Sequence, residues 1–330
     1  MSHLLTRALD SALDRTVVPG YTKIGYWLRR PTWDRDDPRP GSLAGKAVVV
    51  TGGSSGLGKA AAVAMARLGA TVHLVVRDLA KGRDAVTDIR GEVPGAEILL
   101  HRCDVSDLSS VRAFASALRG SAERIDVLVH NAGAMPPSRQ ETADGHEVAL
   151  ATHVLGPVLM TELLRPVLTG ARVVVVSSGG MYAHKLAASD PEFREGEYTG
   201  TVAYARTKRM QVALAPVLQE RWAADGIALH TMHPGWADTP GVVTSLPVFH
   251  KVMGPLLRDP ATGADTIVWL AAAPDAADPS GLFFLDRQAR TKHRLRRTRR
   301  PDEAREAARL WRLCTERTAP FTAGSGGSAA

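Results

Sequence analysis

The sequence predicts an α/β protein with one doubly wound parallel sheet that is covered by helices on both faces. Short β-branched or apolar runs alternate with longer helical segments between about residues 43 and 286. A glycine-rich turn follows the first run, and polar or glycine residues follow the later ones. Because parallel strands end at one edge of a sheet, these residues are expected to meet there as a ligand site.

The first strand and helix are predicted within Lys46–Ala60, where Val48 to Val50 form a run too short for a helix. The following helix, Lys59–Leu68, is expected to end at Gly69. Further strands are expected at Thr71–Val76, Ile98–Cys103, Ile125–Val129, Arg172–Val176, Ile227–Met232 and Leu282–Leu285. Further helices are expected at Leu108–Leu118, Gly145–Leu168 (interrupted by Pro157 and Pro166), Ala203–Ala224 and Ala261–Ala273. A single Rossmann-type domain over residues 43–286 is therefore predicted.

Two appendages are expected to flank this domain. Residues 1–42 are predicted to form one or two amphipathic helices before the Pro-rich linker Arg30–Gly41, because apolar residues recur at helical spacing (Leu4, Leu5, Ala8, Ala12, Ile24, Trp27, Leu28). Burial of that apolar face against the body or a second subunit is the favoured interpretation. Peripheral membrane contact through residues 1–30 is the alternative. Residues 287–330 are expected to form a basic tail, a short helix over Pro301–Arg317 and a disordered end.

Composition and charge exclude several classes of protein. The 330 residues are 45% hydrophobic and 23% charged, which is typical of a globular protein, and no run approaches the ~18 apolar residues of a membrane span. The net charge of +7 is concentrated in Asp286–Arg300, which holds eight Lys or Arg and one Asp. Without interleaved aromatic residues, this segment indicates a solvated tail or a contact with an acidic partner and not a nucleic-acid site.

Cysteine usage and the N-terminus bear on location. Only Cys103 and Cys314 are present, so a disulfide framework is not expected and a reducing cytoplasm is. Charged residues such as Asp10 and Asp14 interrupt the apolar run that a secretion signal would need. The histidines are scattered without a metal-ligand spacing, and no metal site is expected.

The glycine turn after the first strand has the features of a phosphate-binding loop. Gly52, Gly56 and Gly58 allow the backbone to approach a phosphate closely, and the next helix N-terminus adds a partial positive charge. Their spacing differs from the common G-x-G-x-x-G pattern, so the interpretation depends on the strand before the turn and the helix after it. A dinucleotide cofactor is expected, and a glycine turn without a ligand is the alternative.

Tyr204 and Lys208 place a phenol and an ammonium one turn apart on one helix face. A free phenol has a pKa near ~10, and lowering that value by ~3 units requires ~4 kcal/mol of differential stabilisation. The ammonium and an oxidised nicotinamide would both favour the phenolate, which could then exchange a proton with a carbonyl or hydroxyl oxygen. Ser178, after the fifth strand, is expected to hydrogen-bond the same oxygen.

These motifs resemble those of the short-chain dehydrogenase/reductase superfamily over about residues 45–285. The matches are T-G-x-x-x-G-x-G at Thr51–Gly58, N-A-G at Asn131–Gly133, Ser178, Y-x-x-x-K at Tyr204–Lys208 and P-G at Pro234-Gly235. The 26-residue interval between Ser178 and Tyr204 is similar to that of the retinol-dehydrogenase-like branch. Four longer segments resemble one particular member of the superfamily: Tyr21–Tyr26, Ser177–Met181, Tyr204–Val212 and Met232–Val242.

The resemblance implies a role for each matching residue. The catalytic residues would be Ser178, Tyr204 and Lys208, with His153 at the position of the fourth member of the family's tetrad, an Asn. The residues that would bind the cofactor are Thr51, Gly52, Ser54, Ser55, Gly56, Leu57, Gly58, Arg77, Asp104, Val105, Asn131, Ala132, Gly133, Tyr204, Lys208, Pro234, Gly235 and Thr239. Asp104 and Val105 would meet the adenine, and Thr239 the carboxamide. His130 departs from the first Asn that often precedes N-A-G. His153 either holds a water of a proton relay or only fills space in its helix.

Cofactor and substrate class follow from two further features. Arg77 ends the second strand, where an acidic residue would bind a ribose 2′-hydroxyl, so NADP (NADPH) is expected over NAD although Asp78 follows directly. An apolar lid over the nicotinamide is expected from Val242, Val243, Leu246, Val248, Phe249, Val252, Met253, Leu256 and Leu257.

The sequence therefore predicts a cytoplasmic, homo-oligomeric oxidoreductase that interconverts a carbonyl and an alcohol on a small hydrophobic substrate. A non-catalytic dinucleotide sensor or scaffold on the same fold is the alternative. Such a protein would have no reason to keep Ser178, Tyr204 and Lys208 together.

Overall fold

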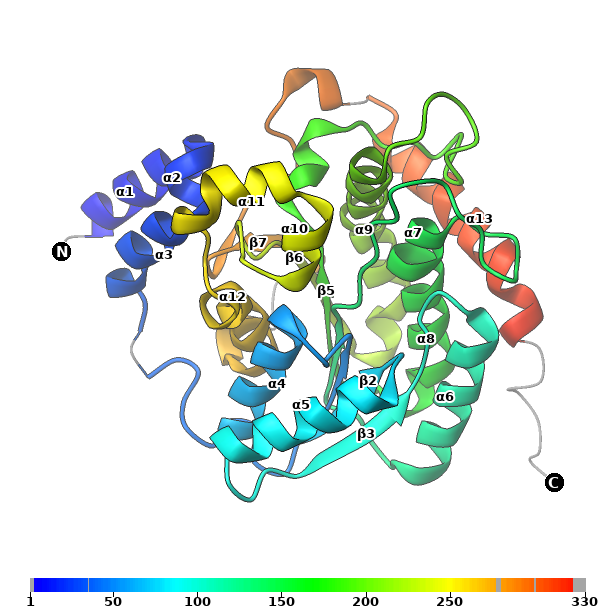
Figure 1. Cartoon of the computed structure of the whole chain (residues 1–330), viewed down its shortest axis with the longest axis horizontal. Coiled ribbons are helices and arrows are strands. Elements are labelled where there is room, and N and C mark those ends of the chain that lie inside the picture. Colours follow the sequence, from blue (N-terminus) through cyan, green and yellow to red (C-terminus); the bar gives the residue numbers. More distant parts are fainter. Residues whose placement is uncertain (1–2, 35, 277–279, 300, 323–330) are drawn as a thin grey trace.

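A computed structural model of the chain describes residues 3–34, 36–276, 280–299 and 301–322 (Figure 1). Its sheet has eight strands in the order β3-β2-β1-β4-β5-β6-β7-β8. The strands are β1 (Ala47–Thr51), β2 (Thr71–Val76), β3 (Ile98–Arg102), β4 (Val127–His130), β5 (Arg172–Val176), β6 (Ala228–Met232), β7 (Phe283–Leu285) and β8 (Gln288–Ala289). All neighbours pair in parallel except β8, which runs antiparallel to β7. The predicted fold class is confirmed, and the strand order reverses between β1 and β4.

The central strands are valine runs because both faces of the sheet are covered. Val48, Val49 and Val50 of β1 are fully buried, and so is Val173 of β5. β-branched side chains suit the pleated backbone and fill both faces, which explains why these strands show no alternation of polar and apolar residues.

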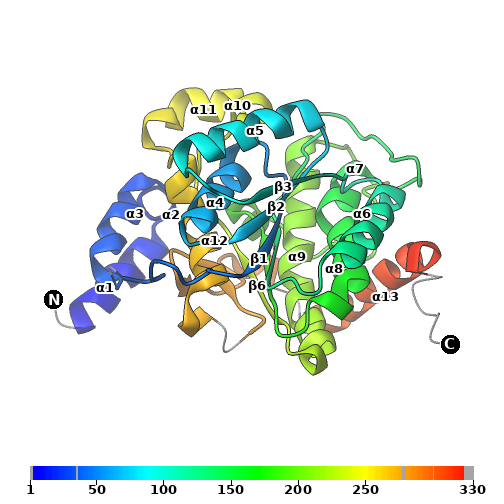
Figure 2. The same ribbon diagram turned by 90° about the horizontal axis from the view of Figure 1, so that it is seen from below.

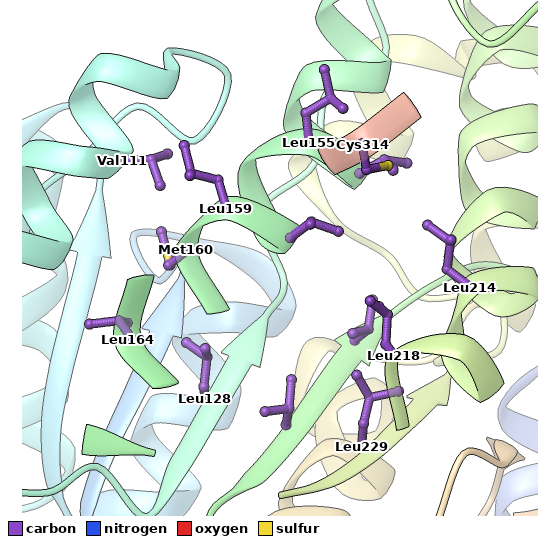
Figure 3. Close-up of a cluster of buried hydrophobic side chains, with 14 of the residues drawn as sticks. Val111, Leu128, Leu155, Leu159, Met160, Leu164, Leu214, Leu218, Leu229 and Cys314 are labelled. Carbon is purple, nitrogen blue, oxygen red and sulfur yellow. The ribbon is translucent and has the colours of Figure 1, made fainter. Parts of the chain in front are cut away.

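Two layers of helices enclose the sheet (Figures 1 and 2). One face packs on α4 (Gly56–Arg67), α5 (Leu79–Glu92) and α12 (Pro260–Ala272). The other packs on α6 (Leu108–Ser121), α8 (Gly156–Leu164), α9 (Gly200–Trp222) and α13 (Glu303–Thr322). Figure 3 shows the leucine-rich core of this second face, which includes Leu159, Leu214 and Leu229 together with Cys314 of α13. Helix α5 was not among the helices predicted from the sequence.

The predicted helix over Gly145–Leu168 begins later and is not interrupted at Pro157. It starts with α7 (Val148–Leu150), widens into a π turn at Ala151–Leu155 and continues as α8. Pro157 lies in the first turn of α8, directly after the π turn, and has no N–H to donate. The His153 carbonyl, four residues earlier, accepts from Gln211 Nε2 instead, whereas Pro166 lies in a terminal 3₁₀ turn. The run Val148–Val167 is long and apolar enough to cross a membrane, but 83% of its most apolar window is buried in the fold. It is a core helix of this domain.

The N-terminal extension forms α1 (His3–Arg15), α2 (Val17–Tyr21) and α3 (Lys23–Arg29), which lie against one side of the body (Figure 1). The expectation that the Ile24, Trp27 and Leu28 face is buried is wrong. These side chains are 42%, 51% and 45% exposed, and the opposite face, with Tyr26 and Arg29, is buried instead. This face of α3 is the buried one because it carries Arg29, which pairs with a charged residue of the body.

A buried charge network attaches this extension. Asp286 is 1% exposed and lies between two guanidiniums, with Oδ2 2.7 Å from Arg29 Nη1 and 2.9 Å from Arg258 Nη2. Arg29 Nε also donates to Asp10 at 2.8 Å. The single carboxylate of Asp286 therefore joins α3, the segment before α12 and the turn after β7.

The basic C-terminal segment was expected to be a solvated tail or to contact an acidic partner. Three of its arginines instead pair with acidic residues of this chain, whereas Arg296, Arg297 and Arg299 are exposed. Arg287 pairs with Asp265 of α12 at 2.7 Å, Arg290 pairs with Asp10 at 2.7 Å, and Arg294 pairs with Asp14. Helix α13 extends the predicted helix to Thr322 and belongs to the main core through Ala307, Leu310 and Cys314. The sequence could not show these partners because they lie up to 280 residues away. The expected disordered end, 323–330, lies outside the described residues.

The network predicts a large loss of stability for Asp286→Asn, which removes the charge and preserves the shape. Asn also tolerates the left-handed backbone of this position, at φ 52°. Because two buried arginines lose their shared counter-charge, the free energy of unfolding should fall by about 3–5 kcal/mol in chemical denaturation.

The matched control is Glu92→Gln, which breaks the ion pair of Glu92 with Arg67, whose side chains are 51% and 56% exposed. This change should cost about 0–1 kcal/mol. Equal effects of the two variants would show that the Asp286 network does not attach the extension.

Candidate active site

The glycine turn between β1 and α4 has a backbone that only glycine supports. Gly52 and Gly56 have φ angles of +67° and +53°. A Cβ on Gly58 would lie 2.4 Å from Asn131 Nδ2 and 2.4 Å from the Gly52 carbonyl oxygen. The turn therefore brings backbone amides close together at the N-terminus of α4, which is the arrangement that binds a pyrophosphate.

Hydrogen bonds from Thr51 and Asn131 fix this turn where the strand order reverses. The Thr51 hydroxyl donates to the Val129 carbonyl at 3.2 Å and accepts the N–H groups of Asn131 at 3.0 Å and Ala132 at 3.1 Å. The Asn131 amide donates to the carbonyls of Thr51 at 3.0 Å and Gly52 at 3.2 Å. Asn131 is thus a support of the turn and not a direct catalytic group.

The remaining residues of the turn differ in their surroundings: Leu57 packs against a helix, whereas Ser54 and Ser55 are half-buried and exposed, respectively. Leu57 packs on α12, where a Cβ on Gly263 would lie 2.6 Å from Leu57 Cδ2. Ser55 is exposed and makes no side-chain cap at the start of α4, and Ser54 is half-buried beside it. The first amides of α4 therefore have no side-chain acceptor from Ser55, so the turn fits a dinucleotide phosphate.

The ends of β2 and β3 carry the residues that were expected to meet the adenosine. Arg77 is 79% exposed, with its Nε 3.9 Å from Asp104 Oδ2. Asp78 caps α5 by accepting from the N–H groups of Ala80 at 2.8 Å and Lys81 at 3.3 Å. Val105 is buried beside Asp104. The carboxylate of Asp78, which follows Arg77 directly, is therefore occupied in capping α5.

The structure brings Ser178, Tyr204 and Lys208 together at the ends of β5 and α9. Lys208 Nζ lies 5.4 Å from the centroid of the Tyr204 ring and donates to the Val176 carbonyl at 2.7 Å. The Ser178 hydroxyl interacts with Tyr204 and accepts the Gly180 N–H at 3.2 Å. Because its oxygen accepts from the backbone, the Ser178 hydroxyl can direct its own proton toward a substrate oxygen.

Burial dominates the electrostatics of this group. It lowers the pKa of Lys208 to about 7 and raises the pKa of Tyr204, with the hydrogen bond from Ser178 acting in the opposite direction. The sequence predicts that the ammonium lowers the pKa of Tyr204. In the structure, burial raises that pKa, and the hydrogen bond from Ser178 is the influence that lowers it.

His153 lies in the π turn beneath Tyr204, with ring centroids 5.3 Å apart. Its Nε2 accepts the Ala134 N–H at 3.0 Å, so the proton of the neutral ring is on Nδ1, which lies 2.8 Å from Thr207 Oγ1. Its carbonyl accepts from Gln211 Nε2 at 2.8 Å. Burial and then the nearby Lys208 hold the pKa of His153 well below its usual range. Both ring nitrogens have protein partners, which favours a positioning role over a water relay.

The loop after β6 closes the crevice from the opposite side. Pro234 is buried, and Gly235 has a φ of +74°. Thr239 caps α10 (Pro240–Ser245) by accepting the Val242 N–H at 3.3 Å. A Cβ on Gly56 would lie 3.4 Å from Thr239 Cβ, so Thr239 faces the glycine turn directly.

Helices α10 and α11 (Pro247–Met253) form the segment expected as an apolar lid. Its Val243, Val248 and Val252 are 44%, 76% and 69% exposed, whereas Leu257 is buried. Phe249 packs edge-on against Trp236 at 5.2 Å. Only part of the apolar surface of this segment therefore faces the protein.

The Ser–Tyr–Lys group, beside a glycine turn at the edge of a 3-2-1-4-5-6-7 parallel sheet, defines an NAD(P)-dependent oxidoreductase that acts on CH–OH or C=O groups. A family model described as short chain dehydrogenase matches residues 46–246. The chain belongs to the short-chain dehydrogenase/reductase family.

Three comparisons describe its relatives. Dehydrogenase/reductase SDR family member 12 of Bos taurus is 44% identical over 279 residues, which cover 83% of this chain and 86% of the relative. This is the member that the four longer segments resemble. Human retinol dehydrogenase 12 is 33% identical over 282 residues, with 83% and 86% covered. The solved structure of an uncharacterized protein from Mycobacterium paratuberculosis has a TM-score of 0.68 and 31% identity, and covers 85% of this chain and 95% of that chain.

Three residues of the site were not among those predicted. Thr207 and Gln211 hold the ring and the carbonyl of His153, and Tyr21 contacts the loops that follow β5 and β6. The signal that could have found them is the resemblance of Tyr204–Val212 and Tyr21–Tyr26 to one superfamily member, because Thr207 and Gln211 lie in the first segment and Tyr21 in the second. Tyr21 belongs to a segment more than 150 residues from either loop.

The contacts of His153 predict that it acts through its position and not through titration. The pH profile of kcat between about pH 5 and 9 should show the same ionisations in wild type and His153→Asn, because the pKa of His153 lies well below its usual value. His153→Ala should lower kcat by about 10- to 100-fold as Thr207 and Ala134 lose their partner. An ionisation near pH ~6 that is present in wild type and absent in His153→Asn would contradict this role.

Proposed function

We propose that the protein catalyses the NADPH-dependent reduction of a small hydrophobic ketone or aldehyde, and the reverse oxidation of the alcohol. The observation that carries the proposal is the meeting of Ser178, Tyr204 and Lys208 beside the glycine turn. The nicotinamide, when bound, supplies or accepts the hydride.

Three side chains of the protein would carry out the other parts of the reaction. In the reductive direction, the Tyr204 hydroxyl donates its proton to the carbonyl oxygen, and the hydroxyl of Ser178 donates a hydrogen bond to the same oxygen. The raised pKa of Tyr204 keeps the phenol in the protonated form that this step needs. Lys208, which donates to the Val176 carbonyl, would hold the nicotinamide ribose and return a proton to Tyr204.

An apolar substrate is supported by the segment over the crevice. Leu246 and Leu256 are partly buried, and Leu257 is buried beneath α10 and α11. A relative that carries the name retinol dehydrogenase 12 gives independent support for an apolar alcohol or aldehyde. Closure of the segment over the ligand would exclude water from the reacting atoms.

Cellular location and assembly form a further part of the proposal. The buried free thiols Cys103 and Cys314 support a reducing, cytoplasmic environment. A homo-oligomer is proposed from the family resemblance alone.

The N-terminal helices support peripheral membrane contact. Val17, Val18, Ile24, Trp27 and Leu28 are each more than 40% exposed on α2 and α3. Four basic residues of the extension are exposed in part or in full: Arg7, Arg15, Lys23 and Arg30. Exposed apolar and basic side chains together fit an anionic bilayer surface. Co-sedimentation of the full chain with anionic but not zwitterionic vesicles tests this part.

Arg77 predicts a preference for NADPH over NADH. An exposed guanidinium at the end of β2 can pair with a 2′-phosphate, and the carboxylate of Asp78 is engaged in capping α5. We expect kcat/KM to favour NADPH by about tenfold or more, a difference of about 1.4 kcal/mol.

The test compares both cofactors in three proteins. Arg77→Ala should remove most of the preference, whereas Arg83→Ala, at an exposed position on α5, should retain it. A wild-type preference for NADH would refute this part of the proposal.

Tyr204→Phe tests the reaction itself on a panel of apolar ketones and alcohols. Because the phenol is the group placed to move the proton, turnover should fall by about 10²- to 10⁴-fold. NADPH binding, followed by the fluorescence of the reduced nicotinamide, should remain close to wild type because the ring is retained. Near-wild-type turnover in Tyr204→Phe would overturn the mechanism. Tight NADPH binding by wild type, with no turnover of any panel member, would favour a dinucleotide sensor.

A further inference from the structure

We propose that the N-terminal extension is a functional part of the active site. The ring of Tyr21 is a positioning residue that holds the loop after β5, which carries Ser178, against the loop after β6, which leads to Thr239. The kinetic part of this inference rests on the proposed carbonyl–alcohol reaction.

Tyr21 contacts the Ser178 loop at its backbone. Gly179 follows Ser178 directly, and a Cβ on Gly179 would lie 2.9 Å from Tyr21 Cε2. The ring therefore packs against the peptide next to the catalytic serine, too closely for a side chain to fit between them. Met181 and Tyr182, from the following turn, belong to the same apolar cluster as Tyr21.

Tyr21 also contacts the loop after β6, through its ring and its backbone. The ring lies 4.7 Å from the ring of His233 and 6.0 Å from that of Trp236, both edge-on. The Tyr21 carbonyl accepts the Trp236 N–H at 2.7 Å. A Cβ on Gly235 would lie 2.6 Å from that carbonyl oxygen. One residue of the extension thus fills the space between the two loops that border the nicotinamide side of the crevice.

Arginine side chains hold the backbone of Tyr21 in place. Arg258 Nε donates to the carbonyls of Tyr21 at 3.1 Å and Thr22 at 3.2 Å, and its Nη2 donates to Gly20 at 3.2 Å. Arg29 donates to the Gly20 carbonyl at 2.9 Å, and both arginines pair with Asp286. Because these groups are buried, the carbonyls have strong donors that water does not replace.

The ring of Tyr21, and not its hydroxyl, makes the side-chain contacts with the two loops. The side chain is 3% exposed, and its hydroxyl has no hydrogen-bond partner among the described residues. Arg294 lies over the ring face, 5.2 Å from the centroid. A phenylalanine would preserve every one of these ring contacts, which gives the proposal a conservative variant.

The experiment compares Tyr21→Ala, Tyr21→Phe and the control Trp27→Ala in the full chain without vesicles. Trp27 lies on α3 and is 51% exposed, so its removal changes the same extension without touching either loop. Two quantities are measured on the folded fraction of each protein: the NADPH dissociation constant and kcat per bound NADPH.

Tyr21→Ala should weaken NADPH binding and lower kcat by about tenfold or more, because both loops lose their common support. For Tyr21→Phe and Trp27→Ala, the NADPH dissociation constant and kcat per bound NADPH should each stay within about twofold of wild type. If Tyr21→Ala does not fold, Tyr21→Leu replaces it, because leucine retains bulk but not the planar ring.

A second arm tests the contact itself. Gly179→Ala should lower kcat in the wild-type background, where the new methyl meets Tyr21, and should cost less in the Tyr21→Leu background. Additive effects of the two substitutions would overturn the proposal. A fall in melting temperature for Tyr21→Ala, with unchanged NADPH affinity and unchanged kcat per bound NADPH, would also overturn it. NADPH affinity tests the role of Tyr21 even if no panel substrate turns over. Failure of this inference is therefore distinguishable from failure of the proposed reaction.

Discussion

The hydroxyl of Thr51 is the point on which the geometry of the site depends. It joins β1 to β4 by three hydrogen bonds, where the strand order reverses and the sheet opens into a crevice. The Asn131 amide continues this connection into the glycine turn, and the contact with Gly58 lets α4 begin directly beside it. Because β2 to β7 are parallel to β1, their carboxyl ends lie at the same edge of the sheet. The glycine turn and the group of Ser178, Tyr204 and Lys208 consequently share one edge of the sheet without any loop spanning the distance between them.

Burial sets the chemistry of that edge. Lys208 is 2% exposed and His153 is 1% exposed, so both lose much of their tendency to be charged. The protein compensates with hydrogen bonds: Lys208 donates to the Val176 carbonyl, the ring of His153 is bonded by the Ala134 N–H and the Thr207 hydroxyl, and its carbonyl accepts from the Gln211 side chain. A neutral His153 between fixed donors and acceptors holds the π turn in one arrangement beneath Tyr204. Helix α9, which carries Thr207 and Gln211, and the π turn that carries His153 are therefore joined by uncharged hydrogen bonds.

The sequence predicted the parts of the molecule that depend on local pattern. The valine run of β1, the glycines at Gly52 and Gly56, and the Tyr204–Lys208 spacing all act through neighbours along the chain, so strands and site could be placed in advance. The orientation of α3 could not be, because Arg29 is selected by Asp286, 257 residues away. The same separation explains why the basic C-terminal segment resembled a solvated tail. The tautomer of His153 also escaped prediction, because it depends on Thr207 and on the amide of Ala134.

The attachment of the extension has a consequence for the order in which the protein can be made. Residues 10–29 leave the ribosome before Asp286, Arg290 and Arg294 are translated. Until those three residues emerge, Arg29 lacks Asp286 and Asp10 lacks Arg290, although the two loops that Tyr21 contacts have already been made. The extension is therefore secured by its charge network only after a segment more than 250 residues further along the chain has been made. A nascent chain stalled before Asp286 would contain the glycine turn, the Tyr–Lys pair and both loops around Tyr21, but not the carboxylate that Arg29 and Arg258 share.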